Sequence, residues 1–243
     1  MSTILERIFA LQKGAIKTVK HKLQPSLSYK FRSYQDEKVY KPWFEPVDTL
    51  SRVNSITLSL DNYLDARRED EKGRSTYSQS ASFRLSQSYD IDELREDKPP
   101  GEERRPYGPL AGSVRLTPYR GLYLAGNVQW DHYESRISTG SISLDLAVKR
   151  GGTRRDTYEI DYVYTRNSAE HLNYAVNVHL FHGFSVGAAR KRDLLVKHDI
   201  ENTYWVDYES QCWGVRLLYE SLNDDTRVFA MLRLLGMGDV GRF

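Results

Sequence analysis

Apolar and polar residues alternate along most of this 243-residue sequence. In residues 77–89, every second position belongs to one set and the positions between them are serines and an arginine; the first set consists of Tyr77, Gln79, Ala81, Phe83, Leu85, Gln87 and Tyr89. Successive side chains of a β-strand point to opposite faces, so only a strand separates these two sets. Helical periodicity is almost absent from the chain. The sequence therefore predicts an all-β fold.

The same alternation recurs along the chain and leaves one face of each segment apolar. Two of these faces carry Leu144 with Leu146 and Val176 with Val178, and no formal charge interrupts them. Many predicted strands run ten residues or more, whereas strands of soluble proteins cluster near five or six and a tilted membrane strand needs roughly 9 to 11. We therefore expect these four side chains to face lipid. Twelve strands are predicted, at residues 22–34, 53–66, 75–89, 110–117, 122–133, 136–149, 156–166, 171–181, 183–192, 199–209, 212–221 and 226–236.

Composition excludes several classes of protein. The chain has no run of about 18 uncharged apolar residues, which excludes membrane-spanning helices. A mean hydropathy of -0.62 is compatible with a membrane barrel, because every second residue of a barrel strand can face a polar lumen. The chain has 35 basic and 33 acidic residues, and this small excess of positive charge predicts no binding to nucleic acid.

Long and short connections between the predicted strands define two ends of the sheet. Residues 35–52 and 90–109 are the long first and third connections, whereas the fourth, eighth and tenth are short. Outer-membrane barrels alternate long extracellular loops with short periplasmic turns, so the odd connections are assigned to the outside. The predicted fold is an antiparallel transmembrane β-barrel of about twelve strands. A soluble β-sandwich would also alternate, but strand length, uncharged faces and aromatic residues near both strand ends favour the membrane form.

Three local patterns invite an enzymatic interpretation. Gly236, Gly238 and Gly241 fit G-x-G-x-x-G, but the chain ends at residue 243 without the helix that a dinucleotide site needs. Asp131 and His132 are adjacent in a strand and so point to opposite faces. Acidic and basic residues alternate in residues 90–109, as expected of a solvated loop. We predict no catalytic, cofactor-binding or metal-binding residue, and therefore a protein that is not an enzyme.

The first residues of the chain lack the features of a secretory leader. Glu6, Arg7 and Lys13 fall where a signal peptide needs a continuous apolar core. If the mature protein is extracytoplasmic, the sequence is then expected to be a fragment or a truncated reading frame. Residues 1–21 are interpreted as a lead-in that can form part of a preceding strand, and residues 22–243 as the barrel.

Several segments resemble one known family. HKLQPSLSYKF at residues 21–31 is similar to an "H-x-x-x-P-x-x-x-Y" strand, and the following KPWFEPVDTLSRVNSITLSLDNYL is similar to a "P-x-F-D" loop and an "N-x-x-x-x-x-L-x-N" strand, with Glu45 where Asp is usual. YESQCWGVRLLYES and TRVFAMLRLLGMGDVG resemble a "Y-x-s-x-C-W" strand and a closing "L-x-G-L-G" strand. Together these motifs resemble, in order, the C-terminal half of the barrel of the LptD (OstA/Imp) family, the lipopolysaccharide-assembly proteins of the Gram-negative outer membrane.

The resemblance implies a function in transport. Lipopolysaccharide (LPS) would arrive along an LptA-like periplasmic bridge through an N-terminal domain outside this chain, and would cross a lateral opening in a larger barrel into the outer leaflet. An LptE-like lipoprotein would fill the lumen, and membrane lipids would surround the wall. Cys212, the single cysteine, would form a disulfide with that N-terminal domain. The last strand would border the opening, and its gate-side residues are Val228, Ala230, Leu232 and Leu234.

Three other functions stay open at this point. Twelve strands could close into a porin-like or other small outer-membrane barrel, although such a channel has no use for Cys212. A soluble β-sheet binding protein would differ in not partitioning into detergent. A lipid-modifying barrel enzyme is disfavoured by the lack of a convergent catalytic pair.

Overall fold

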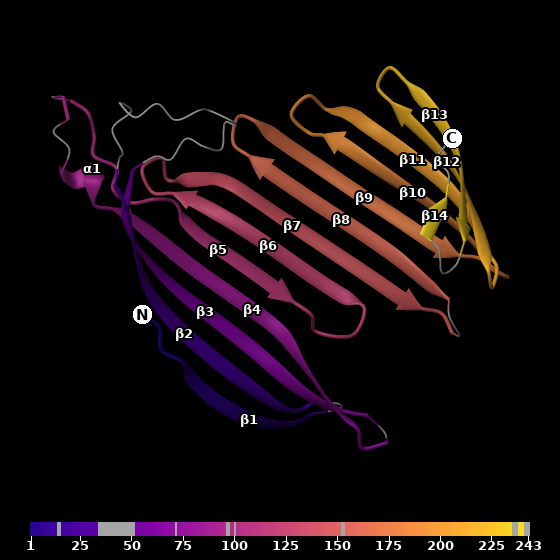
Figure 1. Cartoon of the computed structure of the whole chain (residues 1–243), viewed down its shortest axis with the longest axis horizontal. Coiled ribbons are helices and arrows are strands. Elements are labelled where there is room, and N and C mark those ends of the chain that lie inside the picture. Colours follow the sequence, from indigo (N-terminus) through magenta and orange to yellow (C-terminus); the bar gives the residue numbers. More distant parts are fainter. Residues whose placement is uncertain are drawn as a thin grey trace. The chain divides into compact units, whose positions relative to one another are not determined.

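The structure, a computed structural model, describes residues 1–13, 16–33, 52–70, 72–95, 98–99, 101–151, 154–234 and 238–240 (Figure 1). Fourteen strands and one short helix lie in this part of the chain. They are β1 Leu5–Lys13, β2 Ile16–Arg32, β3 Val53–Glu69, β4 Ser75–Asp90, α1 Asp92–Arg95, β5 Leu110–Leu116, β6 Leu122–Asp131, β7 Arg136–Lys149, β8 Arg155–Thr165, β9 Ala169–His179, β10 Phe184–Asp193, β11 His198–Glu209, β12 Trp213–Leu222, β13 Thr226–Leu234 and β14 Gly238–Val240. The prediction of an all-β fold is confirmed.

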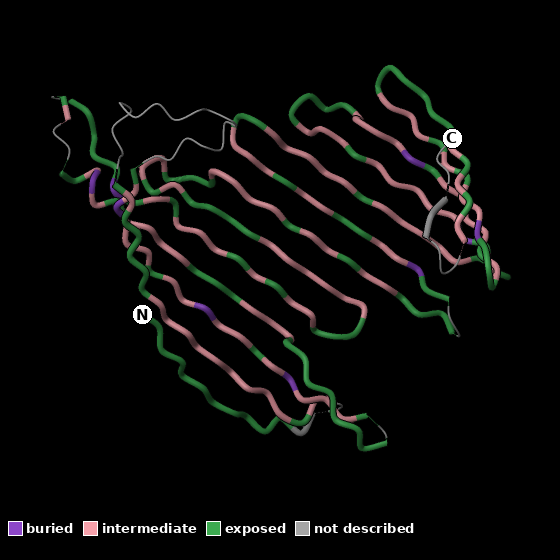
Figure 2. Tube along the Cα trace, in the orientation of Figure 1, coloured by how far each residue is buried: buried purple, intermediate pink, exposed green. Residues whose placement is uncertain are grey.

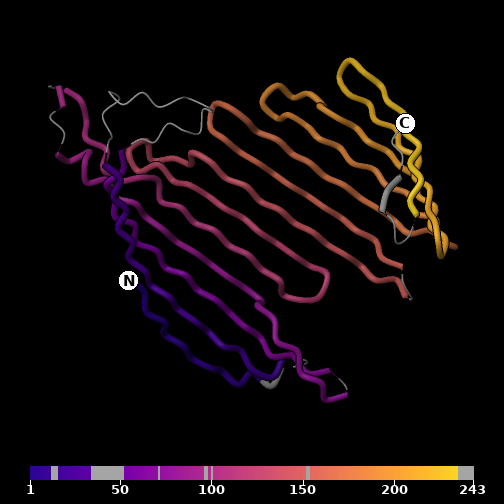
Figure 3. Tube along the Cα trace, viewed as in Figure 1, coloured from indigo at the N-terminus to yellow at the C-terminus, as the bar shows by residue number. Residues whose placement is uncertain are grey.

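The strands follow one another in a single antiparallel sheet in the order of the chain, from β1 to β14. Figure 3 shows this order as a gradual change of colour from each strand to the next. Among the described residues the sheet is not closed, and β1 and β14 are its edges. Barrel closure therefore stays a prediction. None of the helical residues in the described ranges forms a helix long and apolar enough to cross a membrane.

The structure adds two strands to the twelve that were predicted. β1 lies within residues 1–21, which had been assigned to a lead-in, and β2 begins at Ile16 rather than at residue 22. The charged residues of β1 break its alternation, but Lys20 of β2 pairs with Glu6 across the two strands at 2.7 Å. β14 pairs with the last three residues of β13. The predicted connection at residues 35–52 lies outside the described residues, apart from Arg52.

The chain divides into two compact units, Met1–Ser113 with Val128–Ser138, and Val114–Asn127 with Thr139–Phe243. In the first unit, backbone hydrogen bonds connect residues that follow β4 in the sequence to β4 itself. Gly108 N donates to Ser88 O at 3.0 Å, and Asp90 N donates to Pro106 O at 2.7 Å. The buried Asp92 of α1 accepts a hydrogen bond from Asn54 Nδ2 at 2.8 Å. The predicted loop at 90–109 is therefore held against the ends of β3 and β4.

A conventional core is lacking in the part of the chain that the structure describes. Ala66 and Pro106 are the buried residues there with apolar side chains, and most strand residues are half-buried or exposed (Figure 2). A sandwich buries one face of each sheet against a second sheet. Within the described residues of each of the two compact units, the strands form one layer and no second sheet packs on them. The apolar face still needs an apolar environment.

Candidate functional site

Strand register in the second unit assigns the predicted lipid-facing residues to one common face. Directly opposite residues of antiparallel strands share a face. Leu146 lies opposite Tyr158, which lies opposite Val176. Leu144 pairs with Ile160 and Val178 with Val186, on the same face. Their contact with lipid stays a prediction.

This apolar face continues across the following strands. The row that starts at Val178 and Val186 runs through Val206, Leu217 and Ala230. Many of its large side chains are exposed; Ile142 is 55% exposed, Leu217 54% and Val228 70%. A folded soluble protein rarely exposes so extended an apolar surface. The face is therefore built to be covered by apolar material.

An aromatic cluster borders the apolar face at one end of the strands. Phe181 contacts Phe184 with ring centroids 5.7 Å apart, Phe184 contacts Tyr208 at 4.7 Å, and Tyr208 contacts Trp213 at 5.4 Å. These rings lie beside the short turns at residues 180–183 and 210–212. Aromatic girdles occupy this position in outer-membrane strands, where the ring meets both lipid and water.

The opposite face of the second unit carries a polar network across four strands. Asn177, Gly187 and Trp205 lie in one row, and the Trp205 indole N–H donates to Asn177 Oδ1 at 3.0 Å across the glycine between them. A Cβ on Gly187 would lie 2.1 Å from the indole ring, so only glycine leaves room for it. Arg216 makes a two-point ion pair with Asp207 at 2.6 and 2.7 Å and stacks over Trp205.

The first unit has the same division into faces. Leu5, Leu23, Asn62 and Phe83 form a row on the largely apolar face. The other face carries ion pairs between neighbouring strands, including Lys22 with Asp65 at 2.8 Å and Arg84 with Asp61. Two rows of hydroxyl groups follow these pairs along the strands and run across β2, β3 and β4; they are Ser26, Ser59 and Ser86, then Ser28, Thr57 and Ser88. This face can hydrogen-bond to water or to a polar ligand.

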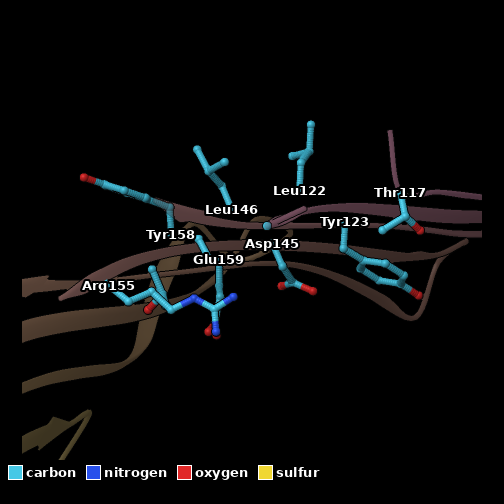
Figure 4. Close-up of a pocket in the computed structure, with 11 residues that line it drawn as sticks. Thr117, Leu122, Tyr123, Asp145, Leu146, Arg155, Tyr158 and Glu159 are labelled. Carbon is cyan, nitrogen blue, oxygen red and sulfur yellow. The ribbon is translucent and has the colours of Figure 1, made fainter. Parts of the chain in front are cut away.

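A hollow of about 210 Å³ lies in the second unit near the turn between β5 and β6. Leu122 and Leu146 point to one side of the sheet, and Tyr123 and Asp145 to the other (Figure 4). Asp145 lies directly opposite Glu159, so two carboxylates meet on the polar face. Among the described residues, no three His, Cys, Asp or Glu side chains come together as a metal site.

The structure separates the residues that were considered for catalysis. Asp131 Oδ1 accepts hydrogen bonds from the backbone N–H groups of Tyr133 and Glu134, while His132 Nε2 contacts Gln87 Oε1 at 2.7 Å. Asp131 therefore caps a turn, and the pair does not converge. Gly238 begins β14, whereas Gly236 and Gly241 lie outside the described residues.

Charged side chains also organise the connections. Lys98 pairs with Glu93 and, together with the Arg105 backbone N–H, holds the pKa of the Glu93 carboxyl below its ordinary value. Hydrogen bonds from the Arg74 backbone and guanidinium lower the pKa of Asp70 in the β3–β4 turn. Both carboxylates are therefore ionised at neutral pH, and each stabilises its loop in that form.

Cys212 and the predicted gate residues lie near the C-terminal end of the sheet. Cys212 is an exposed free thiol in the turn before β12, one residue outside the strand to which it had been assigned. Val228, Ala230, Leu232 and Leu234 share one face of β13. β13 is not the last strand, because β14 pairs with its residues Leu232–Leu234. The roles of Cys212 and of this strand edge stay predictions.

The fold and its two faces define a class: a meander of long antiparallel strands with an exposed apolar face and a polar face crossed by ion pairs. A comparison with known families identifies one family within that class. Residues 4–190 match the family described as LptD, LPS transport system D. This match covers more than half of the sequence, and the chain belongs to the LptD family.

One relative extends the likeness further along the chain. The LPS-assembly protein LptD of Cupriavidus necator is 23% identical over 252 aligned residues, which cover 90% of this chain. The chain covers 29% of the length of that relative. The family is named for transport rather than for a chemical reaction.

Proposed function

We propose that this chain forms part of the wall of an outer-membrane barrel that delivers LPS to the outer leaflet. One observation carries the proposal: in each unit, long strands expose a largely apolar face on one side of the sheet and a polar face with ion pairs on the other. Such a sheet is stable where lipid covers the first face and water fills the second. Membership of the LptD family gives the transported molecule.

In this proposal, the short turns at residues 180–183 and 210–212 lie on the periplasmic side. The aromatic cluster beside them then occupies the inner interface of the membrane. The folded segment at residues 91–109 lies at the opposite end of the strands and faces the cell exterior. The polar face lines the lumen, where hydroxyl and charged groups contact the sugars of LPS and an LptE-like lipoprotein plug.

The open edges of the sheet have a role in the same proposal. The free edge of β1 pairs with strands of the complete protein outside this chain, so that a larger barrel closes. The edge of β13, with β14, borders the lateral opening through which LPS leaves the lumen. Cys212 forms a disulfide with a periplasmic domain that receives LPS from an LptA-like bridge. The exposure of its thiol in a turn leaves it accessible to such a partner.

Depletion of the complete protein in living cells tests this function. Newly made LPS should stop reaching the cell surface, as measured by its accessibility to a surface-acting modifying enzyme, and should accumulate inside. An intact gene supplied on a plasmid should restore delivery. Continued arrival of LPS at the surface together with a loss of small-solute uptake would contradict the proposal and favour a porin-like channel.

A further inference from the structure

Two arginines lie on the apolar face at the loop end of β10, opposite the aromatic cluster. Arg190 pairs with Tyr174 and Asn202, and Tyr174 belongs to the row of Leu144 and Ile160. Arg192 lies two residues further along the same strand and pairs with Leu172. Charges on a lipid-facing surface are costly near the bilayer centre but cost about 0–1 kcal/mol near the interface. Because the two arginines lie near a strand end, their charge is best explained if that end lies at the membrane interface.

A bulge brings a carboxylate to these arginines. Lys191 pairs with Glu201, but the next residue, Arg192, pairs with Asp199, so Ile200 is an extra residue in β11. Regular alternation would place Asp199 on the polar face with Glu201. The bulge turns it to the apolar face, where its carboxylate forms an ion pair with Arg190. Its distance to Arg192 Nε is 3.9 Å, which is too long for a hydrogen bond.

This cluster has more hydrogen-bonding capacity than its partners use. Arg190 Nε, Arg192 Nε and Asp199 Oδ1 are buried atoms without a hydrogen-bond partner. Arg190 also contacts the Tyr174 hydroxyl at 3.5 Å, but in the described part of the chain Arg192 makes no hydrogen bond at all. The Arg192 side chain is 42% exposed, so its terminal nitrogens are accessible. Buried or half-buried guanidinium groups without acceptors are unfavourable, and an incoming anion would remove that cost.

In the cluster itself, two guanidinium groups face one carboxylate. Asp199 balances one of the two arginines. Glu170, at the start of β9 on the same face, accepts a hydrogen bond from the Tyr162 hydroxyl at 2.9 Å and forms no ion pair with either arginine. The adjoining turn carries one positive charge, on Lys197, and one negative charge, on Asp193, whose carboxylate accepts hydrogen bonds from the backbone N–H groups of Leu195 and Val196. The turn also presents two exposed apolar residues, Leu195 and Val196, which are 50% and 71% exposed. Basic groups beside exposed apolar side chains match a phosphate attached to an acyl chain.

We infer that Arg190 and Arg192, with the Tyr174 hydroxyl, bind the phosphate group of an anionic membrane lipid at the outer interface. The lipid would lie against the apolar face below the phosphate, while Leu195 and Val196 enter the headgroup region. This inference rests on the proposed function, because it needs the apolar face to be in a bilayer. It goes beyond that function, since the lipid bound here surrounds the wall and does not pass through the lumen.

Native mass spectrometry of the complete protein in detergent micelles tests the inference. The protein is titrated with dioleoyl phosphatidic acid and, separately, with dioleoyl phosphatidylcholine. We expect tighter binding of phosphatidic acid, and a loss of about fivefold in its affinity in R192Q, the effect of one basic residue near a membrane surface. Lys191→Gln is the matched control, because it removes the same charge from the neighbouring position on the polar face. It should leave the affinity unchanged.

Asp199→Asn keeps the test independent of folding defects. It removes the competing carboxylate, so phosphatidic acid should bind more tightly, whereas a damaged structure would bind more weakly. Inorganic phosphate at millimolar concentration should not displace the lipid; displacement would mean that a soluble anion occupies the site, and would overturn the inference. Equal affinity in wild type, R192Q and K191Q would overturn it as well, and would leave the proposed function intact. A protein that does not fold in micelles or vesicles would contradict both.

Discussion

Replacing Gly187 by alanine should disrupt the polar network of the second unit. An added Cβ would lie 2.1 Å from Cε2 and Cζ2 of Trp205 and 2.5 Å from its Nε1. Real Cβ contacts are essentially never shorter than 3.0 Å, so the indole has to move away. Its hydrogen bond to Asn177 Oδ1 is 3.0 Å long, and the ring shift that relieves the clash breaks it.

The cost follows from the interactions that the indole loses. The hydrogen bond contributes about 0.5–1.5 kcal/mol, and the contact with Arg216 adds about 0.5–1 kcal/mol at a half-exposed site. Together with the strain of a displaced ring, we expect Gly187→Ala to lower the free energy of unfolding by about 1–3 kcal/mol. Gly126→Ala is the matched control, because its Cβ would meet its nearest neighbour at 3.4 Å. We expect its cost to stay below about 0.5 kcal/mol.

Urea unfolding of the refolded protein in detergent micelles, followed by circular dichroism, measures both values. A double-mutant cycle with Trp205→Ala isolates the contact, since alanine at position 187 should cost little once the indole is gone. Equal destabilisation by the two glycine substitutions would refute the reasoning. So would a Gly187→Ala cost that persists unchanged in the Trp205→Ala background.

Three further predictions address the faces, the loops and the thiol. Leu144→Arg should lower the free energy of unfolding in lipid by about 2–4 kcal/mol if this residue is at the bilayer midplane, and Ser143→Arg by much less; equal costs would show that the faces are wrongly assigned. The folded-state pKa of Glu93 lies below its ordinary value of 4.5. The ion pair with Lys98 therefore stabilises the 91–109 segment fully at pH values above 4.5, and this stabilisation is lost as the pH falls through the lower folded-state pKa. Pepsin cleavage of this segment should therefore increase in the wild type as the pH falls below 4.5. E93Q should be cleaved as readily above that pH as below it. Cys212→Ser should abolish a mobility difference of the complete protein between reducing and non-reducing gels; an identical difference in the mutant would exclude a disulfide at Cys212.

Alternation was sufficient to predict most strands, because the place of each residue in the pattern indicates the face of the strand on which its side chain lies. It failed where pairing between strands compensates for charge. Glu6 and Arg7 interrupt the alternation of apolar and polar residues in β1. The strand is explained by its pairing with β2, in which Lys20 lies opposite Ile8 and forms an ion pair with Glu6. The helix α1 and the pairing of Gly108 with Ser88 also depend on contacts that the local sequence does not reveal.

The candidate sites illustrate the same limit. Period two assigns Leu144 and Val176 to the apolar side of their own strands, and only the register places these two sides on one common face. The bulge at Ile200 moves the Asp199 side chain from the polar face to the apolar face, and the local sequence does not predict such an extra residue. Gly187 did leave a signal, since a glycine inside a strand often marks the close approach of another group. The approaching group, Trp205, is identified only by the pairing of β10 with β11.

Photo-crosslinking from the two faces of β9 tests most directly whether the polar face guides LPS and the apolar face meets the membrane. A photoreactive amino acid is placed at Ala175, on the polar face in the row of Glu159, or at the adjacent Val176, on the apolar face. Cells that make the complete protein then receive a short pulse of labelled LPS precursor. We expect labelled LPS to crosslink first to position 175, while position 176 captures phospholipid. Labelled LPS that reaches position 176 first, or never reaches position 175, would contradict it.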